Sequence, residues 1–349
     1  MSRIATIIRR RAPRHRQQGA VAIMVAFVIM LLLMLAALAV DSFHVFVVRN
    51  ELQNDADAAA LAGADHFFTG TPLPNAALAE EQADKAIAFN RTMHNLLTTG
   101  DVETGYWNAV SGFSSTQVAA TDPLAVRVEV SQSNGNNGGP VELFLGNVLG
   151  IQSVPVFARA VAVSTPPGMV WPGQLFPMVM TQCMFDNFWD TANNRPLNDP
   201  ATGQPYVFRV GSSYHYSSCE SGQWTSFQLN RDDVPTIRML LEEGNTEAIG
   251  VGDPTWIEPG TKTTLFGDVN DCSAVGDKSC EYVTIPVVAT NDIDTHANVP
   301  VSAFSCVRIR RSEGGSNKYI EVQMATGCKA DGEGGGTYYG SATPAKLSQ

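Results

Sequence analysis

Six cysteines are the residues whose type and number offer the clearest chemistry in this sequence. An even number of cysteines in an oxidising compartment is typical of disulfides. All six lie in the second half of the chain: Cys183, Cys219, Cys272, Cys280, Cys306 and Cys328. Many pairings are open, and we expect pairing in sequence order, with a short Cys272–Cys280 loop. A zinc site is the alternative, but the sequence has no Cys-x-x-Cys pair and no histidine at ligand spacing.

Catalytic motifs are absent from the sequence. There is no Gly-x-Ser-x-Gly, no Gly-rich phosphate-binding loop and no His-Glu-x-x-His. His215 lies four residues before Cys219, a spacing that would suit a thiol–imidazole pair. A cysteine held in a disulfide cannot act as a nucleophile, however. We therefore predict that the protein is not an enzyme and has no catalytic or cofactor-binding residues.

Two acidic turns are candidates for calcium binding. Asp268-Val269-Asn270-Asp271 and Asn291-Asp292-Ile293-Asp294 could both supply oxygen ligands. Neither has the spacing of an EF-hand loop, and acidic turns are common on protein surfaces. We therefore predict no metal site and no cofactor.

A long apolar stretch near the N-terminus indicates a membrane span. No charged residue occurs between Gln17 and Val40. A helix of this length reaches about 36 Å, whereas the hydrocarbon core of a bilayer needs about 30 Å. No polar face interrupts it, as one would in a soluble protein, and we predict a single membrane-spanning helix. Its anchor residues include Ala20, Val21, Phe27, Leu31, Leu35 and Val40.

The flanking charges predict the orientation of this helix. Six arginines precede the apolar stretch, and no acidic residue occurs before Asp41. Short flanks rich in Lys and Arg stay in the cytoplasm, so the N-terminus should be cytoplasmic and the rest of the chain exported. The exported part is acidic, because it holds all 34 acidic residues. This charge argues against nucleic-acid binding.

A cleaved signal peptide is the alternative to a retained anchor. Ala37-Leu38-Ala39 fits the small-x-small pattern of a cleavage site that follows a basic region. The apolar run before this point is longer than the usual core of a signal peptide, and it continues through Val40. We expect the segment to be retained, and the body is exported in either case.

The helix is predicted to continue beyond the membrane. No Pro or Gly occurs between Gly19 and Gly63, and the later part is rich in alanine, the best helix former. Ala59 and Gly63 form a small-x-x-x-small pair that lets another backbone approach closely. A candidate helix-docking face, which could serve self-association, comprises Leu52, Asp57, Ala59 and Gly63. The alternative is ordinary packing of this face against the protein's own domain.

The rest of the chain predicts an α+β fold. Pro72 and Pro74 break the long helix, and Asn75 caps a second helix from Ala76 to about Leu97. Strands at 102–108, 125–131 and 154–164 and a short helix near 141–149 follow. Beyond residues 165–168, short apolar runs between turns predict a mostly β domain that contains the cysteines.

The expected domains follow this division. They are a basic cytoplasmic segment (1–16), a transmembrane helix that continues outside the membrane (17–69), a small α+β unit (70–164), a Cys-containing, mostly β domain (165–330) and a flexible tail rich in Gly, Ser and Thr (331–349).

Two stretches resemble a known family. One runs from Gln18-Gly19-Ala20 through the apolar span to Leu52-Gln53-Asn54-Asp55-Ala56-Asp57-Ala58-Ala59-Ala60-Leu61-Ala62-Gly63-Ala64. The other includes Gly105-Tyr106-Trp107-Asn108, Phe144-Leu145-Gly146 and Ala158-Arg159-Ala160-Val161-Ala162. Residues 17–164 thereby resemble TadG-like (TadE/TadG-like) proteins, which are membrane components of the bacterial Flp (tight-adherence, Tad) pilus assembly system. The Cys-containing half resembles them only in general character.

Two departures narrow what the resemblance implies. Pilins processed by prepilin peptidase carry Glu at the fifth position after the cleavage glycine, whereas Met24 stands fifth after Gly19. This argues against a repeating filament subunit. Some members of the group carry a von Willebrand-type domain with an Asp-x-Ser-x-Ser metal motif, which this sequence lacks. Metal-dependent adhesion is therefore not expected.

The resemblance implies a non-enzymatic component of a Flp/Tad pilus assembly system. It would be a single-pass protein of the bacterial inner membrane, with its body in the periplasm. The expected partners are membrane lipid and other pilus-assembly proteins. A surface adhesin or ligand-binding module on a helical stalk is the alternative, and a membrane-tethered hydrolase lacks catalytic motifs.

Overall fold

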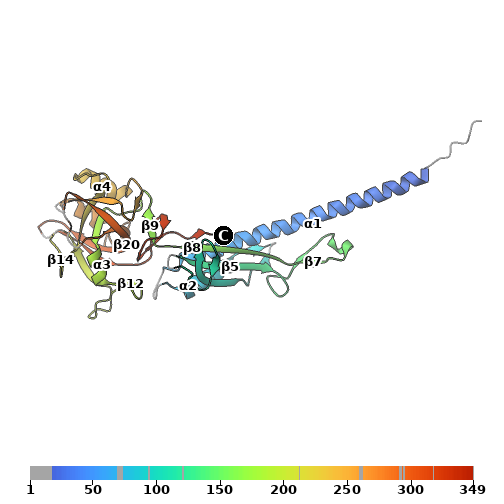
Figure 1. Cartoon of the computed structure of the whole chain (residues 1–349), viewed down its shortest axis with the longest axis horizontal. Coiled ribbons are helices and arrows are strands. Elements are labelled where there is room, and N and C mark those ends of the chain that lie inside the picture. The colour runs from blue at the N-terminus through green and yellow to red at the C-terminus, as the bar shows by residue number, and fades with distance from the viewer. Residues whose placement is uncertain are drawn as a thin grey trace, which may run out of the picture.

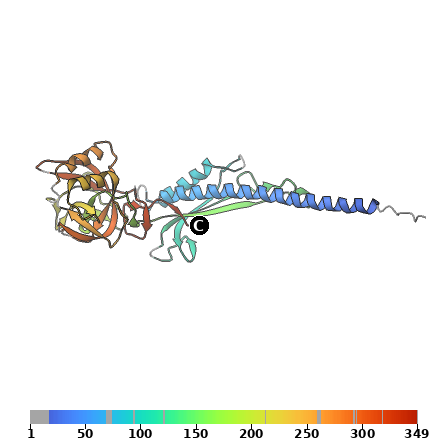
Figure 2. The ribbon, with the colours of Figure 1, turned by 90° about the horizontal axis from the view of Figure 1, so that it is seen from above.

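Helix α1 (Gln18–Asp65) is a single unbroken helix of 48 residues, as predicted. The computed structural model describes residues 18–68, 74–92, 95–119, 122–211, 213–258, 262–290, 293, 295–316 and 318–348. The expected basic segment, 1–16, lies outside this range. The first half of α1 projects from one end of the molecule, and a β domain lies at the other end (Figures 1 and 2).

The second half of α1 and helix α2 (Ala76–Phe89) cover one face of an antiparallel sheet. The strand order is β26-β8-β5-β3-β4. The strands are β3 (Asp101–Asn108), β4 (Gly112–Ser114), β5 (Leu124–Gln132), β8 (Val156–Ser164) and β26 (Lys346–Leu347). Side chains alternate between the two faces of a strand. Val126, Val128 and Val130 are accordingly buried, whereas Arg127 and Glu129 form ion pairs with Glu103 and Arg159.

Helix α2 starts where the sequence predicts and ends earlier. The Asn75 side chain accepts a hydrogen bond from the Leu78 N–H at 3.0 Å and caps the helix. At Asn90 the backbone turns extended, so the helix ends at Phe89 instead of near Leu97. Two short strands follow: β1 (Arg91–Thr92) and β2 (Asn95–Leu96).

The helix expected at 141–149 is a small hairpin instead. Strands β6 (Val141–Glu142) and β7 (Ser153–Val154) pair, and only a 3-10 turn, η1 (Gly146–Leu149), lies between them. Glycine explains the short turn, because Gly150 adopts the left-handed conformation that ends a helix.

The Cys-containing part is built around a curled sheet. Its strands are β10 (Met178–Thr181), β13 (Val207–Val210), β16 (Gly222–Phe227), β18 (Pro254–Glu258), β19 (Tyr282–Val288), β20 (Ala297–Glu313), β21 (Tyr319–Met324) and β24 (Tyr338–Tyr339). The long β20 pairs with β18 near its start, with β19 in its middle and with β21 at its end. The pairings therefore close a ring, β20–β18–β16–β10–β19, as in a small barrel. We call this part the barrel domain.

Short elements surround the barrel. Helices α3 (Gln182–Phe188), α4 (Val234–Glu243) and α5 (Leu265–Cys272) pack on it. The small strands are β9 (Pro167–Val170), β11 (Trp189–Asp190), β12 (Arg195–Pro196), β14 (His215–Tyr216), β15 (Cys219–Glu220), β17 (Ile249–Gly250), β22 (Cys328–Lys329), β23 (Gly332–Gly334) and β25 (Ser341–Ala342). The molecule as a whole is α+β, as the sequence predicts.

The C-terminal segment, for which we expected a flexible tail, instead forms strands. Tyr338 and Tyr339 are buried. Strand β26 then returns to the N-terminal unit, where Lys346 and Leu347 pair with Val163 and Ala162 of β8 (Figure 1). The composition of this segment predicts flexibility. The segment is ordered instead because its aromatic side chains are buried and because β26 pairs with the edge of β8.

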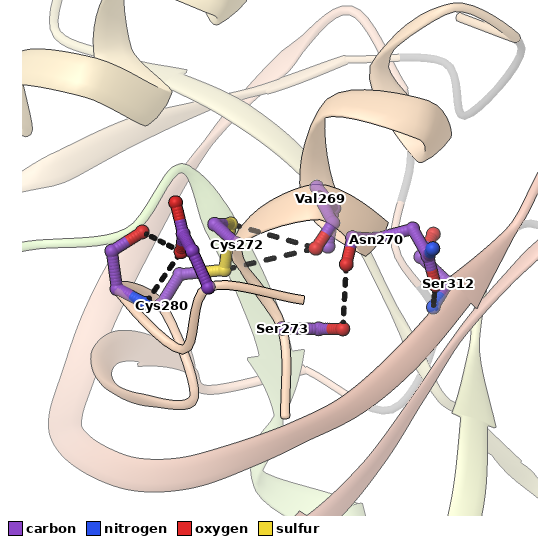
Figure 3. Close-up of a disulfide and its surroundings, with 8 residues drawn as sticks. Val269, Asn270, Cys272, Ser273, Cys280 and Ser312 are labelled. Atoms are coloured by element: carbon purple, nitrogen blue, oxygen red, sulfur yellow. Dashed lines mark hydrogen bonds between the residues drawn. A yellow bond between two sulfur atoms is a disulfide. The ribbon is translucent and has the colours of Figure 1, made fainter. Parts of the chain in front are cut away.

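Three disulfides join the cysteines in the predicted sequence order: Cys183–Cys219, Cys272–Cys280 and Cys306–Cys328. The second ties the end of α5 to the following loop (Figure 3). There the Cys280 N–H donates to the Cys272 carbonyl at 2.9 Å. The Asn270 side chain accepts from the Ser312 N–H of β20 at 3.2 Å, which holds the end of α5 on the barrel.

The disulfides should differ in their contribution to stability. Cys183–Cys219 spans 36 residues and Cys272–Cys280 spans 8. Because a longer loop loses more entropy when it is closed, replacing the first pair with alanine should cost about 4 kcal/mol and the second about 2.5 kcal/mol. Denaturant unfolding of the full chain in detergent, followed by tryptophan fluorescence, measures the difference. Equal losses would contradict the loop-entropy explanation.

Candidate functional site along the N-terminal helix

The first half of α1 is apolar and exposed. It is long and apolar enough to cross a membrane, and its apolar stretch is not buried by the rest of the protein. Val21, Phe27, Leu31, Leu35 and Val40 all project from the helix without protein contacts that would bury them. The side chain of Ala20 lies outside the described residues. An apolar surface of this size exposed on every side of a helix indicates a lipid environment.

Asp41 marks the residue at which α1 changes environment. It is 7% exposed, and its carboxylate accepts hydrogen bonds from the backbone N–H groups of Phe144 (2.8 Å) and Leu145 (3.1 Å). The hairpin that carries η1 is thereby attached to α1 at the end of the apolar stretch. In the sequence, Asp41 is only the charged residue that ends the apolar stretch. Its hydrogen bonds could not be predicted, because their partners lie about a hundred residues further along the chain.

The candidate docking face is covered by the protein's own domain. Leu52 and Ala59 are fully buried. A Cβ atom added at Gly63 would lie 2.9 Å from the Ala79 carbonyl oxygen of α2 and 3.1 Å from Val126 of β5. Asp57 is half-buried and accepts from Gln53 at 2.8 Å. Gly63 therefore lies in the contact between α1 and α2, which is the alternative that the sequence left open.

Asp55, which the sequence did not single out, is a buried carboxyl group on the same helix. The Thr92 hydroxyl donates to it at 3.1 Å. Burial raises the pKa of Asp55, the nearby Glu51 adds to this effect, and the Thr92 hydrogen bond opposes it. The carboxyl group ties β1 to α1 and carries an electrostatic cost when it is ionised.

The other candidates for chemistry are occupied by structural contacts. Cys219 is bonded to Cys183 and is not a free thiol beside His215. Asp268 pairs with Arg238 at 2.9 Å, and part of the second acidic turn, 291–292 and 294, lies outside the described residues. Among the described residues, no three His, Cys, Asp or Glu side chains lie together so that they could hold a metal ion.

Two family models match the N-terminal half of the chain. Residues 19–66 match the family described as putative Flp pilus-assembly TadE/G-like, and residues 51–162 match the one described as putative Tad-like Flp pilus-assembly. Together the two matches span residues 19–162, and both describe Flp pilus-assembly proteins of the TadE/TadG-like kind. The resemblance seen in the sequence is thereby confirmed. No curated protein and no solved structure matches the chain.

The two Tad-like segments overlap on α1. The first covers the apolar half and its continuation, and the second runs from Glu51 to Ala162 within β8. The barrel domain follows both matched segments, and β26 then completes the Tad-like sheet. The Tad-like unit is thus the sheet β26-β8-β5-β3-β4 with the second half of α1 and with α2, and the barrel domain is inserted before its last strand, β26.

Close packing at Gly63 gives a first test of this unit. Gly63→Val should destabilise it by about 2 kcal/mol, because the added carbons meet the backbone of α2. Ala58→Val is the matched control, because Ala58 is exposed on the same helix and only helix propensity changes there, by about 0.5 kcal/mol. Thermal unfolding of the full chain in detergent, followed by circular dichroism, compares the two. Equal melting temperatures would contradict the close contact.

Asp55 gives a test that depends on pH. A carboxyl group whose pKa is raised on folding costs stability only when it is ionised, so the cost is absent below the ordinary pKa of 3.8 and grows as the pH rises through the folded-state value. Asp55→Asn should therefore become more stable relative to wild type as the pH rises from acidic to neutral.

Thr92→Val tests the same effect in the opposite direction. The substitution removes the hydrogen bond that lowers the pKa of Asp55. The variant should therefore become less stable relative to wild type as the pH rises over the same range. Melting temperatures measured across that range check both variants, and parallel curves for all three proteins would contradict the assignment.

Proposed function

We propose that the protein is a non-enzymatic component of a Flp/Tad pilus assembly system, anchored in the bacterial inner membrane by α1. Its N-terminus lies in the cytoplasm and its body in the periplasm. The observation that carries the proposal is the change along α1 at Asp41: the helix is exposed and apolar before this residue and is packed into the Tad-like unit after it.

Charge and disulfides support the orientation. The arginines before the apolar stretch favour a cytoplasmic N-terminus. The three disulfides of the barrel domain favour an oxidising compartment such as the periplasm. Both features support the same location for the body, outside the cytoplasm.

The arrangement of the units supports a role in assembly. The apolar half of α1 and the barrel domain lie at opposite ends of the molecule (Figures 1 and 2). With α1 in the membrane, the barrel domain is held away from the lipid, where it can contact other pilus-assembly proteins. The Tad-like unit between them acts as a spacer that is attached to the anchor without a flexible linker.

Deleting the gene should abolish pilus assembly, and the full-length chain should restore it. The matched control replaces residues 1–40 with a cleavable signal peptide, so that the same body is exported without its anchor. This version should not restore pili, because the body is no longer held at the membrane. Electron microscopy of surface pili gives the readout. Normal pili after deletion would contradict the proposal.

Protease access tests the location of the body. The barrel domain should be cleaved in spheroplasts and protected in intact cells, whereas cleavage in intact cells would support the surface-adhesin alternative. A periplasmic protein and a cytoplasmic protein of known location are the controls.

A further inference from the structure

Exposed apolar side chains lie on two sides of α1 where its apolar half ends. The hairpin between β6 and β7 extends along α1, away from the barrel domain (Figure 1). It exposes Phe144 (65%), Leu145 (41%) and Ile151 (51%). On α1 itself, Phe43 and Phe46 are exposed. We call these five side chains the collar.

The hairpin is held in place at this height on the helix. Asp41 binds the N–H groups of Phe144 and Leu145, and the rings of His44 and Phe144 lie 4.8 Å apart. Gly146 lets the turn close, because a Cβ atom there would be 2.6 Å from the Ile151 carbonyl oxygen. The apolar side chains are thus presented by an ordered turn, although the fold itself does not bury them.

The collar occupies more than one side of the helix. Successive residues turn by about 100°, so Phe43 and Phe46 lie about 200° and 140° around α1 from Asp41. The hairpin is therefore on one side of the helix and the two phenylalanines are on the other. They lie about 3 to 8 Å beyond Asp41 along the helix axis.

We propose that the collar inserts into the periplasmic interface of the bilayer that α1 spans. This proposal rests on the proposed membrane anchor. The collar continues directly from the apolar run, and residues 20–40 already reach about 30 Å, the thickness of the hydrocarbon core. A protein partner would meet one side of the helix, whereas a lipid surface that crosses the helix meets both sides at one height.

The chemistry of the collar fits the lipid interface. Phe, Leu and Ile are side chains that amphipathic segments insert at the boundary between headgroups and acyl chains. Asp41 is compatible with this position, because its carboxylate is buried and bound by backbone N–H groups. The collar gives the body a second contact with the membrane, beside the helix, and so restricts its tilt.

Single cysteines introduced into the full chain test this contact. All six native cysteines are in disulfides, so a thiol-reactive fluorophore labels only the new site. The test sites are Phe144→Cys and Ile151→Cys, and Phe27→Cys reports the anchor. Val110→Cys is the aqueous control, because Val110 is 97% exposed. It lies in the turn after β3, and the pairing of β3 with β5 and of β5 with β8 places that turn at the end of the sheet nearest the barrel domain.

The labelled proteins are reconstituted into vesicles of phosphatidylethanolamine and phosphatidylglycerol that carry lipids with a nitroxide quencher close to the headgroup. Each variant is first checked for wild-type circular dichroism. Labels at 144 and 151 should be quenched at least about twofold more than the label at 110, because side chains of this kind lie within the interface.

The pattern of quenching separates the two proposals. The label at 27 is tested with a second quencher, placed at the middle of the acyl chain. If this quencher acts on the label at 27, but the headgroup quencher acts on the labels at 144 and 151 no more than on the label at 110, the collar is overturned and the anchor stays in place. If the label at 27 escapes the second quencher, the anchor is overturned and the collar with it.

Discussion

The structure depends on one unbroken run of backbone hydrogen bonds in α1. Inside lipid, every backbone N–H and C=O must find a partner within the chain, and the absence of Pro and Gly from Ala20 to Ala62 makes a continuous helix possible. The same helix then packs on β5 and β8. Because no flexible linker separates the two halves, the direction of the apolar half fixes the direction of the Tad-like unit.

The sequence predicts the helices and strands that depend on neighbouring residues. The start of α2 follows from Asn75, and the strands β19 and β21 coincide with short runs rich in β-branched and aromatic residues. The ring of strands in the barrel domain has no such signal, since one strand, β20, pairs with four others at different positions. The return of β26 is equally non-local, because its partner β8 lies about 180 residues earlier.

The contacts of the site along α1 also depend on residues that are far apart in the sequence. The small-x-x-x-small pair Ala59 and Gly63 correctly indicates a close contact, but sequence spacing cannot say whether the contact lies within the chain or between chains. The nearest atoms, on Ala79, Ala83 and Val126, decide for the protein's own domain. Asp41 and Asp55 could not be distinguished from solvated carboxylates, because their partners at Phe144, Leu145 and Thr92 come together only in the folded chain.

The inserted barrel domain changes how the two ends of the molecule are connected. Two chain segments join it to the Tad-like sheet, one leaving β8 and one entering β26, and hydrogen bonds between Ser164, Thr165 and Thr343 hold them together. Lys329 adds an ion pair to Asp65 at the end of α1, with a distance of 2.9 Å. The barrel domain is therefore connected to the rest of the molecule by two paired strands and one helix end. Such a connection is stiffer than a single linker. Since β8 packs directly on α1, the strand that leads into the barrel domain rests on the same helix whose apolar half projects from the molecule.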